Sequence, residues 1–133
     1  MGKLENTVAI AQGMTLEDFL RLPDWKKPYL EYEEGTITQK VSPKAKHSRL
    51  QKALVLRFDT SGATGKVAEA FAELRFSFRG RSYIPDVSVY RHGRIPRDAS
   101  GEIADDFFEL PDIVVEMLSP KQRVTRVIRR CVW

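Results

Sequence analysis

The chain has 133 residues, of which 42% are hydrophobic and 30% charged, with a formal net charge of +4. This length and balance predict one globular domain with a core of its own. No apolar run approaches the roughly 20 residues that span a bilayer, and no signal-peptide pattern opens the chain. The single cysteine, Cys131, excludes an internal disulfide and argues against a structural zinc cluster.

Signals for the start and the end of a helix define the first predicted elements. Residues 1–14 are expected to form an N-terminal arm, followed by a single domain over residues 15–133. The sequence Thr-Leu-Glu-Asp at 15–18 is typical of a capping box, and it predicts a short helix over 16–22 that Pro23 ends.

A hairpin and a longer helix follow. Strands are predicted over 29–33 and 36–41, with a turn at Glu34-Gly35. Residues 46–59 have helical spacing. The side chains predicted on the inner face of this helix are His47, Leu50, Gln51, Leu54 and Phe58.

Strict alternation of apolar residues predicts a strand over 67–78, and a returning strand over 83–90. A two-residue loop at Gly80-Arg81 would place Leu74 opposite Val87. A slip of one residue would move every side chain to the other face, so the pattern supports this register.

In that register Glu73 faces Ser88 and is a diagonal neighbour of Asp86, about 7–8 Å away. A third acid, Glu116, interrupts the apolar stretch PDIVVEMLSP, which we predict to be a strand. Buried carboxylates repel one another and resist ionisation, so three of them need a counter-charge. Arg75 or a hard divalent cation would supply it.

The last 13 residues carry bases and no acid, whereas the first 120 residues are close to neutral. A phosphate backbone attracts such a cluster, although bases near the end of a helix also favour its dipole. These bases are Lys121, Arg123, Arg126, Arg129 and Arg130.

Four motifs occur in a familiar order. They are "YLEYEEG", "VSPKAKH", "IPDVSV" and "VVEMLSP". Together they resemble a bacterial family of restriction-endonuclease-like proteins, once called a domain of unknown function, within the PD-(D/E)xK nuclease superfamily. The resemblance implies an α/β fold with a mixed sheet flanked by helices and a metal site on its open face.

The resemblance also implies the roles of site residues. Asp86 and Glu116 match the two metal-binding acids, and the backbone carbonyl of Met117 would complete the protein ligands. Glu73 and Glu31 match further acids that could bind the metal or orient a water. The implied cofactor is Mg²⁺, or Mn²⁺ in its place, and the implied reaction is hydrolysis of DNA phosphodiesters.

The chain departs from the family pattern at two places. The superfamily lysine would stand two residues after Glu116, where this chain has Leu118, and Arg130 on the following helix takes the expected position of a displaced lysine. Arginine retains the charge but cannot act as a general base. Family members also continue beyond the point where this chain stops at Trp133, so we expect a domain shortened at its C-terminus.

The sequence therefore predicts a cytoplasmic, Mg²⁺-dependent DNA endonuclease that does not contact membranes and pairs as a homodimer. Its expected nucleic-acid contacts are His47 and the C-terminal bases. The alternative is a catalytically silent member that binds nucleic acid or oligomerises. Structural roles also stay open: Asp86 as a turn acid, Glu116 as an ion-pair partner, Glu73 and Glu31 as surface acids, and His47 as a core histidine.

Overall fold

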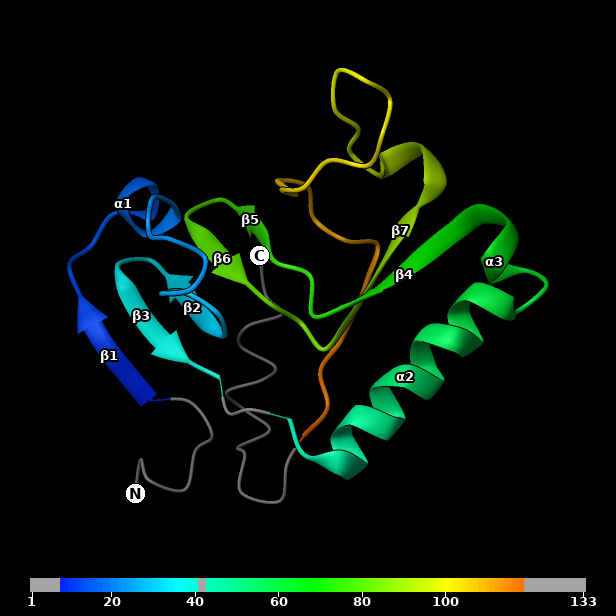
Figure 1. Ribbon diagram of the computed structural model, residues 1–133, viewed down its shortest axis with the longest axis horizontal. Helices are drawn as coiled ribbons and strands as arrows, with labels where there is room; N and C mark the ends of the chain where they lie inside the picture. Colours follow the sequence, from blue (N-terminus) through cyan, green and yellow to red (C-terminus); the bar gives the residue numbers. More distant parts are fainter. Residues whose placement is uncertain (1–7, 41–42, 119–133) are drawn as a thin grey trace. The chain divides into compact units, whose positions relative to one another are not determined.

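A computed structural model describes residues 8–40 and 43–118 (Figure 1). Contacts between residues divide the chain into two compact units. Among the described residues, the first unit contains 8–40, 79–83 and 117–118, and the second contains 43–78 and 84–116. Each unit is described in turn.

The first unit is built mainly from an antiparallel sheet. Its strands lie in the order β1-β3-β2-β6, and β2 and β3 form the predicted hairpin, with Tyr32 opposite Ile37. The helix α1 precedes this hairpin. The elements are β1 (Val8–Gln12), α1 (Leu16–Leu20), β2 (Leu30–Glu33), β3 (Thr36–Gln39) and β6 (Arg81–Tyr83).

The core of the first unit forms where α1 meets the sheet. The Asp18 amide donates to the Thr15 hydroxyl at 3.1 Å, so the predicted cap starts the helix. This start directs Phe19 inward, where its ring stacks on Tyr32 with 5.5 Å between centroids. The Tyr32 hydroxyl donates to the Met14 carbonyl at 2.7 Å, which satisfies its polar end.

The second unit combines a long helix with a three-stranded antiparallel sheet in the order β4-β7-β8. The predicted helix is confirmed as α2. The elements are α2 (Ala45–Thr60), α3 (Thr64–Val67), β4 (Ala68–Ala72), β5 (Phe76–Phe78), β7 (Val87–Arg91), the short helix η2 (His92–Arg94) and β8 (Ile113–Val115).

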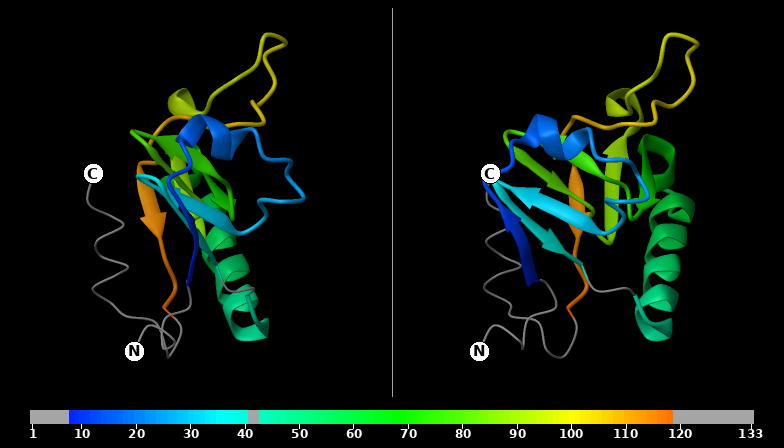
Figure 2. Two further views of the ribbon diagram at one scale, coloured as in Figure 1. Left: turned by 90° about the vertical axis from the view of Figure 1, so that its left-hand side faces the viewer. Right: turned by 60° about the vertical axis from the view of Figure 1, so that its left-hand side comes forward.

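The helix α2 packs along β4 and β7, and Figure 2 shows this arrangement from two further directions. Aromatic rings fill the core of the second unit. Phe71, Tyr90 and Phe107 meet edge to face, with 5.0 to 6.0 Å between ring centroids. Phe107 comes from the long connection between β7 and β8, so this packing holds that connection against the sheet.

The prediction for residues 67–78 is wrong in two respects: the strand is divided into β4 and β5, and its register differs. Ala72, not Leu74, lies opposite Val87, so the register differs by two residues from the prediction. The reason is the turn: Arg79 and Gly80, both with positive φ, separate β5 from β6. A shift of two preserves which face each side chain occupies.

Four other expectations also need correction. The strand β1 lies in the predicted arm, and Glu116 follows the end of β8 instead of interrupting a strand. Leu50 is 50% exposed, so it lies outside the inner face of α2. Glu31 is only 2% exposed, so the surface role is wrong for this acid.

The connection between β7 and β8 projects from the sheet, at the top of Figure 1. A bridge between Arg97 and Ile103 closes its tip. Inside the tip, the Asp98 carboxylate accepts hydrogen bonds from the Ser100 hydroxyl and from two backbone amides. The Ser100 hydroxyl contributes most to lowering the pKa of Asp98. The tip is therefore an internally bonded turn.

Candidate active site

Three acids lie side by side at one end of the β4-β7-β8 sheet. Val87 is opposite Ala72 on one neighbouring strand and opposite Val115 on the other. One residue further along, Glu73 follows Ala72, Asp86 precedes Val87 and Glu116 follows Val115. The strand register therefore places the backbones of Glu73, Asp86 and Glu116 at adjoining positions, with Asp86 in the centre.

The central acid, Asp86, is enclosed by the helix and the neighbouring strand. Its side chain is buried, and His47 Nε2 on α2 lies 3.1 Å from its Oδ1. Its backbone carbonyl accepts hydrogen bonds from Gln51 Nε2 at 2.7 Å and from the Glu73 amide at 3.3 Å. A buried carboxylate needs such contacts, and here they also fix the position of its main chain.

Glu73 has a backbone conformation that is rare for its residue type. Its φ of 49° lies in the left-handed region, which costs roughly 1–2 kcal/mol for a residue other than glycine. The residue stands where the chain leaves β4, directly beside Asp86. Such conformations often occur at functional sites, because the surrounding structure has to hold them.

Two buried side-chain atoms among the described residues have no hydrogen-bond partner: His47 Nδ1 and Ser88 Oγ. Both belong to this region, since His47 contacts Asp86 and Ser88 is two residues further along β7. Buried polar atoms are nearly always paired, so each of these two atoms would take a water or another polar group as its partner.

Within residues 8–40 and 43–118, no group of three or more His, Cys, Asp or Glu side chains is placed to hold a metal ion. The predicted ligand set names the carboxylates of Asp86, Glu116 and Glu73 with the Met117 carbonyl, and two of these carboxylates with a backbone carbonyl would suffice for Mg²⁺. Magnesium retains several waters and is commonly bound through one or two carboxylates. The oxygen donors at the ends of β7 and β8 fit that chemistry.

The other predicted site residues are placed as follows. Glu31 is buried on β2 in the first unit, where its register partner is Thr38. Met117 is half-buried and follows Glu116. The C-terminal bases, from Lys121 to Arg130, lie outside the described residues.

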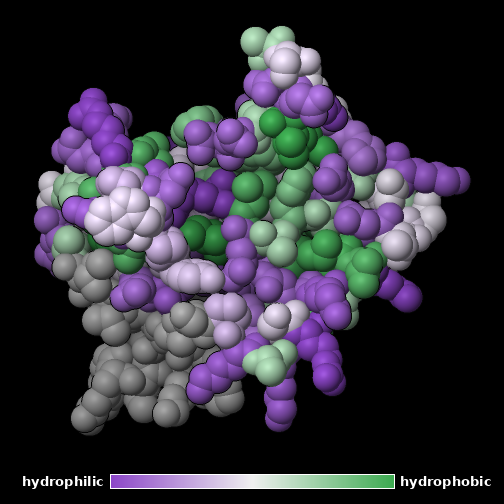
Figure 3. All heavy atoms as spheres, in the orientation of Figure 1, coloured by the Kyte–Doolittle hydropathy of each residue, from purple (hydrophilic) through white to green (hydrophobic). Residues whose placement is uncertain are grey.

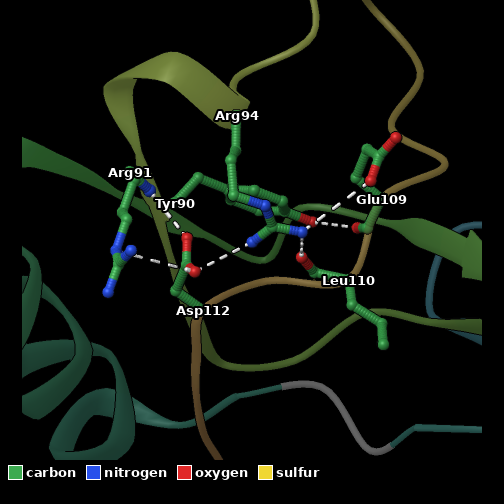
Figure 4. Close-up of polar contacts among 6 residues, drawn as sticks. All are labelled: Tyr90, Arg91, Arg94, Glu109, Leu110 and Asp112. Carbon is green, nitrogen blue, oxygen red and sulfur yellow. Dashed lines mark hydrogen bonds and ion pairs between the residues drawn. The ribbon is translucent and has the colours of Figure 1, made fainter.

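The opposite end of the same sheet carries a cluster of ion pairs (Figure 4). Asp112 Oδ1 lies 2.9 Å from Arg94 Nη1, and its Oδ2 accepts from the Arg91 amide at 2.8 Å. Arg94 also donates to the Leu110 carbonyl at 2.7 Å and lies 3.7 Å from the Glu109 carboxylate. We call Arg91, Arg94, Glu109, Leu110 and Asp112 the arginine clamp.

Two pKa values are shifted at the arginine clamp and beside it. Burial acts to raise the pKa of Asp112, but the Arg91 amide and the Arg94 guanidinium outweigh it, so the pKa lies below its usual value. Burial raises the pKa of Tyr90, whose hydroxyl donates to the Glu109 carbonyl at 2.8 Å. Because the Asp112 amide also donates to the Val89 carbonyl at 2.8 Å, the clamp holds the start of β8 against β7.

The sequence indicated His47 but assigned no role to Gln51. Both lie on the inner face of α2, four residues apart, so one contacts the carboxylate of Asp86 and the other its carbonyl. This four-residue spacing was the signal in the sequence that could have placed Gln51 beside His47 at the site. The partner could not be predicted, because Asp86 is 35 residues beyond Gln51 in the chain.

Comparisons with known proteins concern the fold and the family of the chain. The fold is a mixed α/β fold with antiparallel sheets, and it is similar to the crystal structure of "a putative nuclease belonging to DUF820" from Anabaena variabilis, with a TM-score of 0.80 and 42% identity. The match covers 89% of this chain and 65% of that one, so the chain spans slightly less than two thirds of that protein.

The family model described as "Putative restriction endonuclease" (Uma2) matches residues 16–133, so the chain belongs to this family, as its motifs predicted. A search of curated proteins finds no match. Within the described part of the chain, no helix is both long and apolar enough to cross a membrane.

Proposed function

We propose that this protein is a metal-dependent DNA endonuclease that hydrolyses phosphodiester bonds at the end of the β4-β7-β8 sheet. The observation that carries the proposal is the position of Asp86. It is buried, contacts His47, and lies between Glu73 and Glu116 on the neighbouring strands. Membership of a restriction-endonuclease family and the similarity to a DUF820 nuclease support the same reaction class.

In this proposal Asp86 and Glu116 bind Mg²⁺, or Mn²⁺ in its place, together with the Met117 carbonyl. The bound ion supplies Lewis-acid chemistry, by polarising the scissile phosphate and lowering the pKa of a bound water. Glu73 is a further oxygen donor or orients that water. The family resemblance assigns Arg130 to stabilising charge on the phosphate and Glu31 to orienting a water, and both assignments stay predictions.

The chain's own contacts explain how Asp86 would be kept in place. His47 Nε2 restrains one carboxylate oxygen, and Gln51 and the Glu73 amide restrain the backbone. Side chains that position a metal ligand commonly affect metal affinity or activity by 10–100-fold. His47 is therefore proposed as a positioning residue in addition to its predicted contact with DNA.

The test is nicking of supercoiled plasmid by wild type, Asp86→Asn and a matched control, Asp105→Asn, which makes the same change at an exposed acid of the β7–β8 connection. We expect wild type and the control to nick only with Mg²⁺ or Mn²⁺. Asp86→Asn should lower the rate at least about 100-fold, as removal of one electrostatic contact at a reaction centre commonly does.

Equal nicking by Asp86→Asn and wild type would contradict the proposal. Retention of DNA by a wild-type protein that never nicks would instead support the alternative, a silent module that binds nucleic acid. Analytical ultracentrifugation checks the proposed homodimer separately, since the monomer and the dimer differ twofold in mass.

A further inference from the structure

The outer side of α2 carries a run of positive charge. From residue 44 to residue 58 the chain has five lysines or arginines and no acid. All five are exposed, and they are Lys44, Lys46, Arg49, Lys52 and Arg57. We call these five residues the basic face of α2. In Figure 3, hydrophilic side chains project from the lower right, where α2 lies in Figure 1.

Helix stability does not account for this charge pattern. A helix dipole favours acids in the first turn and bases in the last. The first turn of α2 has no acid, its N-cap is Lys44, and that lysine makes no side-chain capping bond. The helix's one acid, Asp59, is near its C-terminus, where its Oδ1 accepts a hydrogen bond from the Ala70 amide at 2.8 Å. Lys44, Lys46 and Asp59 thus oppose the dipole, and Arg57 in the last turn favours it.

Internal ion pairs do not account for the basic face either. In the part of the chain that the structure describes, none of its five residues forms an ion pair with an acid. Lys46, Arg49 and Lys52 follow one another at intervals of three residues, so they span about 9 Å along the helix at 1.5 Å per residue. Duplex DNA carries about one negative charge per 1.7 Å of its axis, so several phosphates lie within that length.

The basic face and the candidate active site are carried by the same helix. His47, which contacts Asp86, is next to Lys46 in the first turn, and Gln51, which binds the Asp86 carbonyl, is next to Lys52. The inner side of α2 thus positions the acid, and its outer side presents the bases. A phosphate backbone bound along the outer side would thus be held by the same helix that positions Asp86.

We propose that the basic face of α2 binds the phosphate backbone of duplex DNA, without reading its sequence, and so delivers a strand to the Asp86 site. This inference rests on the proposed endonuclease function and names a contact surface other than the C-terminal bases. Backbone contacts from lysine and arginine position a duplex but do not specify its sequence. The basic face should therefore control affinity and its salt dependence.

The experiment compares two triple variants that change the net charge equally. One is Lys46→Gln/Arg49→Gln/Lys52→Gln on α2. The control is Arg21→Gln/Lys26→Gln/Arg97→Gln, at exposed positions outside α2. Binding of a fluorescein-labelled duplex is measured by anisotropy in EDTA over a series of KCl concentrations, so that no cleavage occurs. Circular dichroism confirms that both variants fold.

We expect the α2 variant to bind at least about tenfold more weakly than wild type at low salt. The slope of log K against log [salt] should fall by about 0.9 for each phosphate that the variant no longer neutralises, and so by roughly 2–3 in total. The control variant should keep the wild-type slope. With Mg²⁺ present, the α2 variant should show a raised KM for nicking with kcat little changed.

Equal slopes for wild type and the α2 variant would overturn this inference. They would leave the endonuclease proposal intact, because that proposal is decided by metal-dependent nicking and by Asp86→Asn. Sedimentation with vesicles that contain anionic lipid tests a membrane partner. If the α2 variant failed to bind vesicles and kept wild-type DNA binding, the basic face would be a lipid surface and the inference would be wrong.

Discussion

Both ends of the β4-β7-β8 sheet carry acids, but their surroundings differ. At the end where β8 starts, Asp112 and Glu109 contact the Arg94 guanidinium. At the end where β8 finishes, the buried Asp86 contacts the imidazole of His47. Glu73 and Glu116 directly follow β4 and β8, the strands on either side of β7. The acids at the first end are therefore paired with a guanidinium, which is always charged.

The difference teaches which acids serve the fold and which are candidates for chemistry. The arginine clamp holds the start of β8 against β7, and the strand then runs to Val115, with Glu116 directly after it. The clamp is therefore a structural device that sets the position of a site residue. At the other end, by contrast, His47 beside Asp86 has an unpaired buried nitrogen, and the backbone of Glu73 is strained.

The largest expected difference is in the nicking rate, between variants of the two acids that flank β8. Glu116→Gln should lower the nicking rate at least about 100-fold with little change in melting temperature, because the neutral amide binds a divalent cation poorly. Asp112→Asn should leave most nicking activity intact. Plasmid nicking and thermal melting of the two variants measure both effects. An equal fall in activity in both would show that the two ends of β8 do not have separate roles.

The next prediction concerns pH and the arginine clamp. Because its folded-state pKa is lowered, Asp112 stabilises the fold above its unfolded pKa, and this contribution is lost as pH falls through the folded pKa. The side chain is 26% exposed, so screening limits the effect to about 1 kcal/mol. Asp112→Asn should be less stable than wild type near pH 7.

The same variant should lose less stability than wild type between pH 7 and about pH 3. Urea titrations across this range measure both proteins. Parallel pH dependences in the two proteins would contradict a role for Asp112 in acid sensitivity. Asp105→Asn serves as the control, since it removes a carboxylate outside the clamp.

The smallest effect is expected at Glu73. Glycine adopts its left-handed conformation readily, so Glu73→Gly should raise the free energy of unfolding by up to about 1 kcal/mol, while nicking falls. Glu73→Gln keeps the strain and removes only the charge. If Glu73→Gly raised stability and also retained full activity, the strained backbone and the carboxylate would both be dispensable.

Local signals in the sequence predicted much of the first unit and the long helix. Thr15 marks the start of α1, Glu34-Gly35 marks the turn between β2 and β3, and helical spacing marks α2. These signals depend on residues that are close together in the chain, so the elements can be predicted before the tertiary structure is known. The four motifs likewise identified the family and indicated Asp86 and Glu116.

Other features depend on partners that are distant in the chain. The strand β1 is recognised only by its pairing with β3, and the register of β4 against β7 follows from positive φ at Arg79, a residue that rarely signals such a turn. Contact between Gln51 and Asp86 joins residues 35 positions apart. No local pattern contains this information.

The amino-acid sequence by itself therefore determined the family, the helix and strand types, and the candidate acids, because short-range spacing and capping encode them. Only the tertiary structure decided that Glu73, Asp86 and Glu116 lie at one sheet end, that His47 and Gln51 restrain Asp86, and that arginines neutralise the other end. The physical reason is that strand register and ion pairing are settled by packing between segments that the chain brings together only on folding.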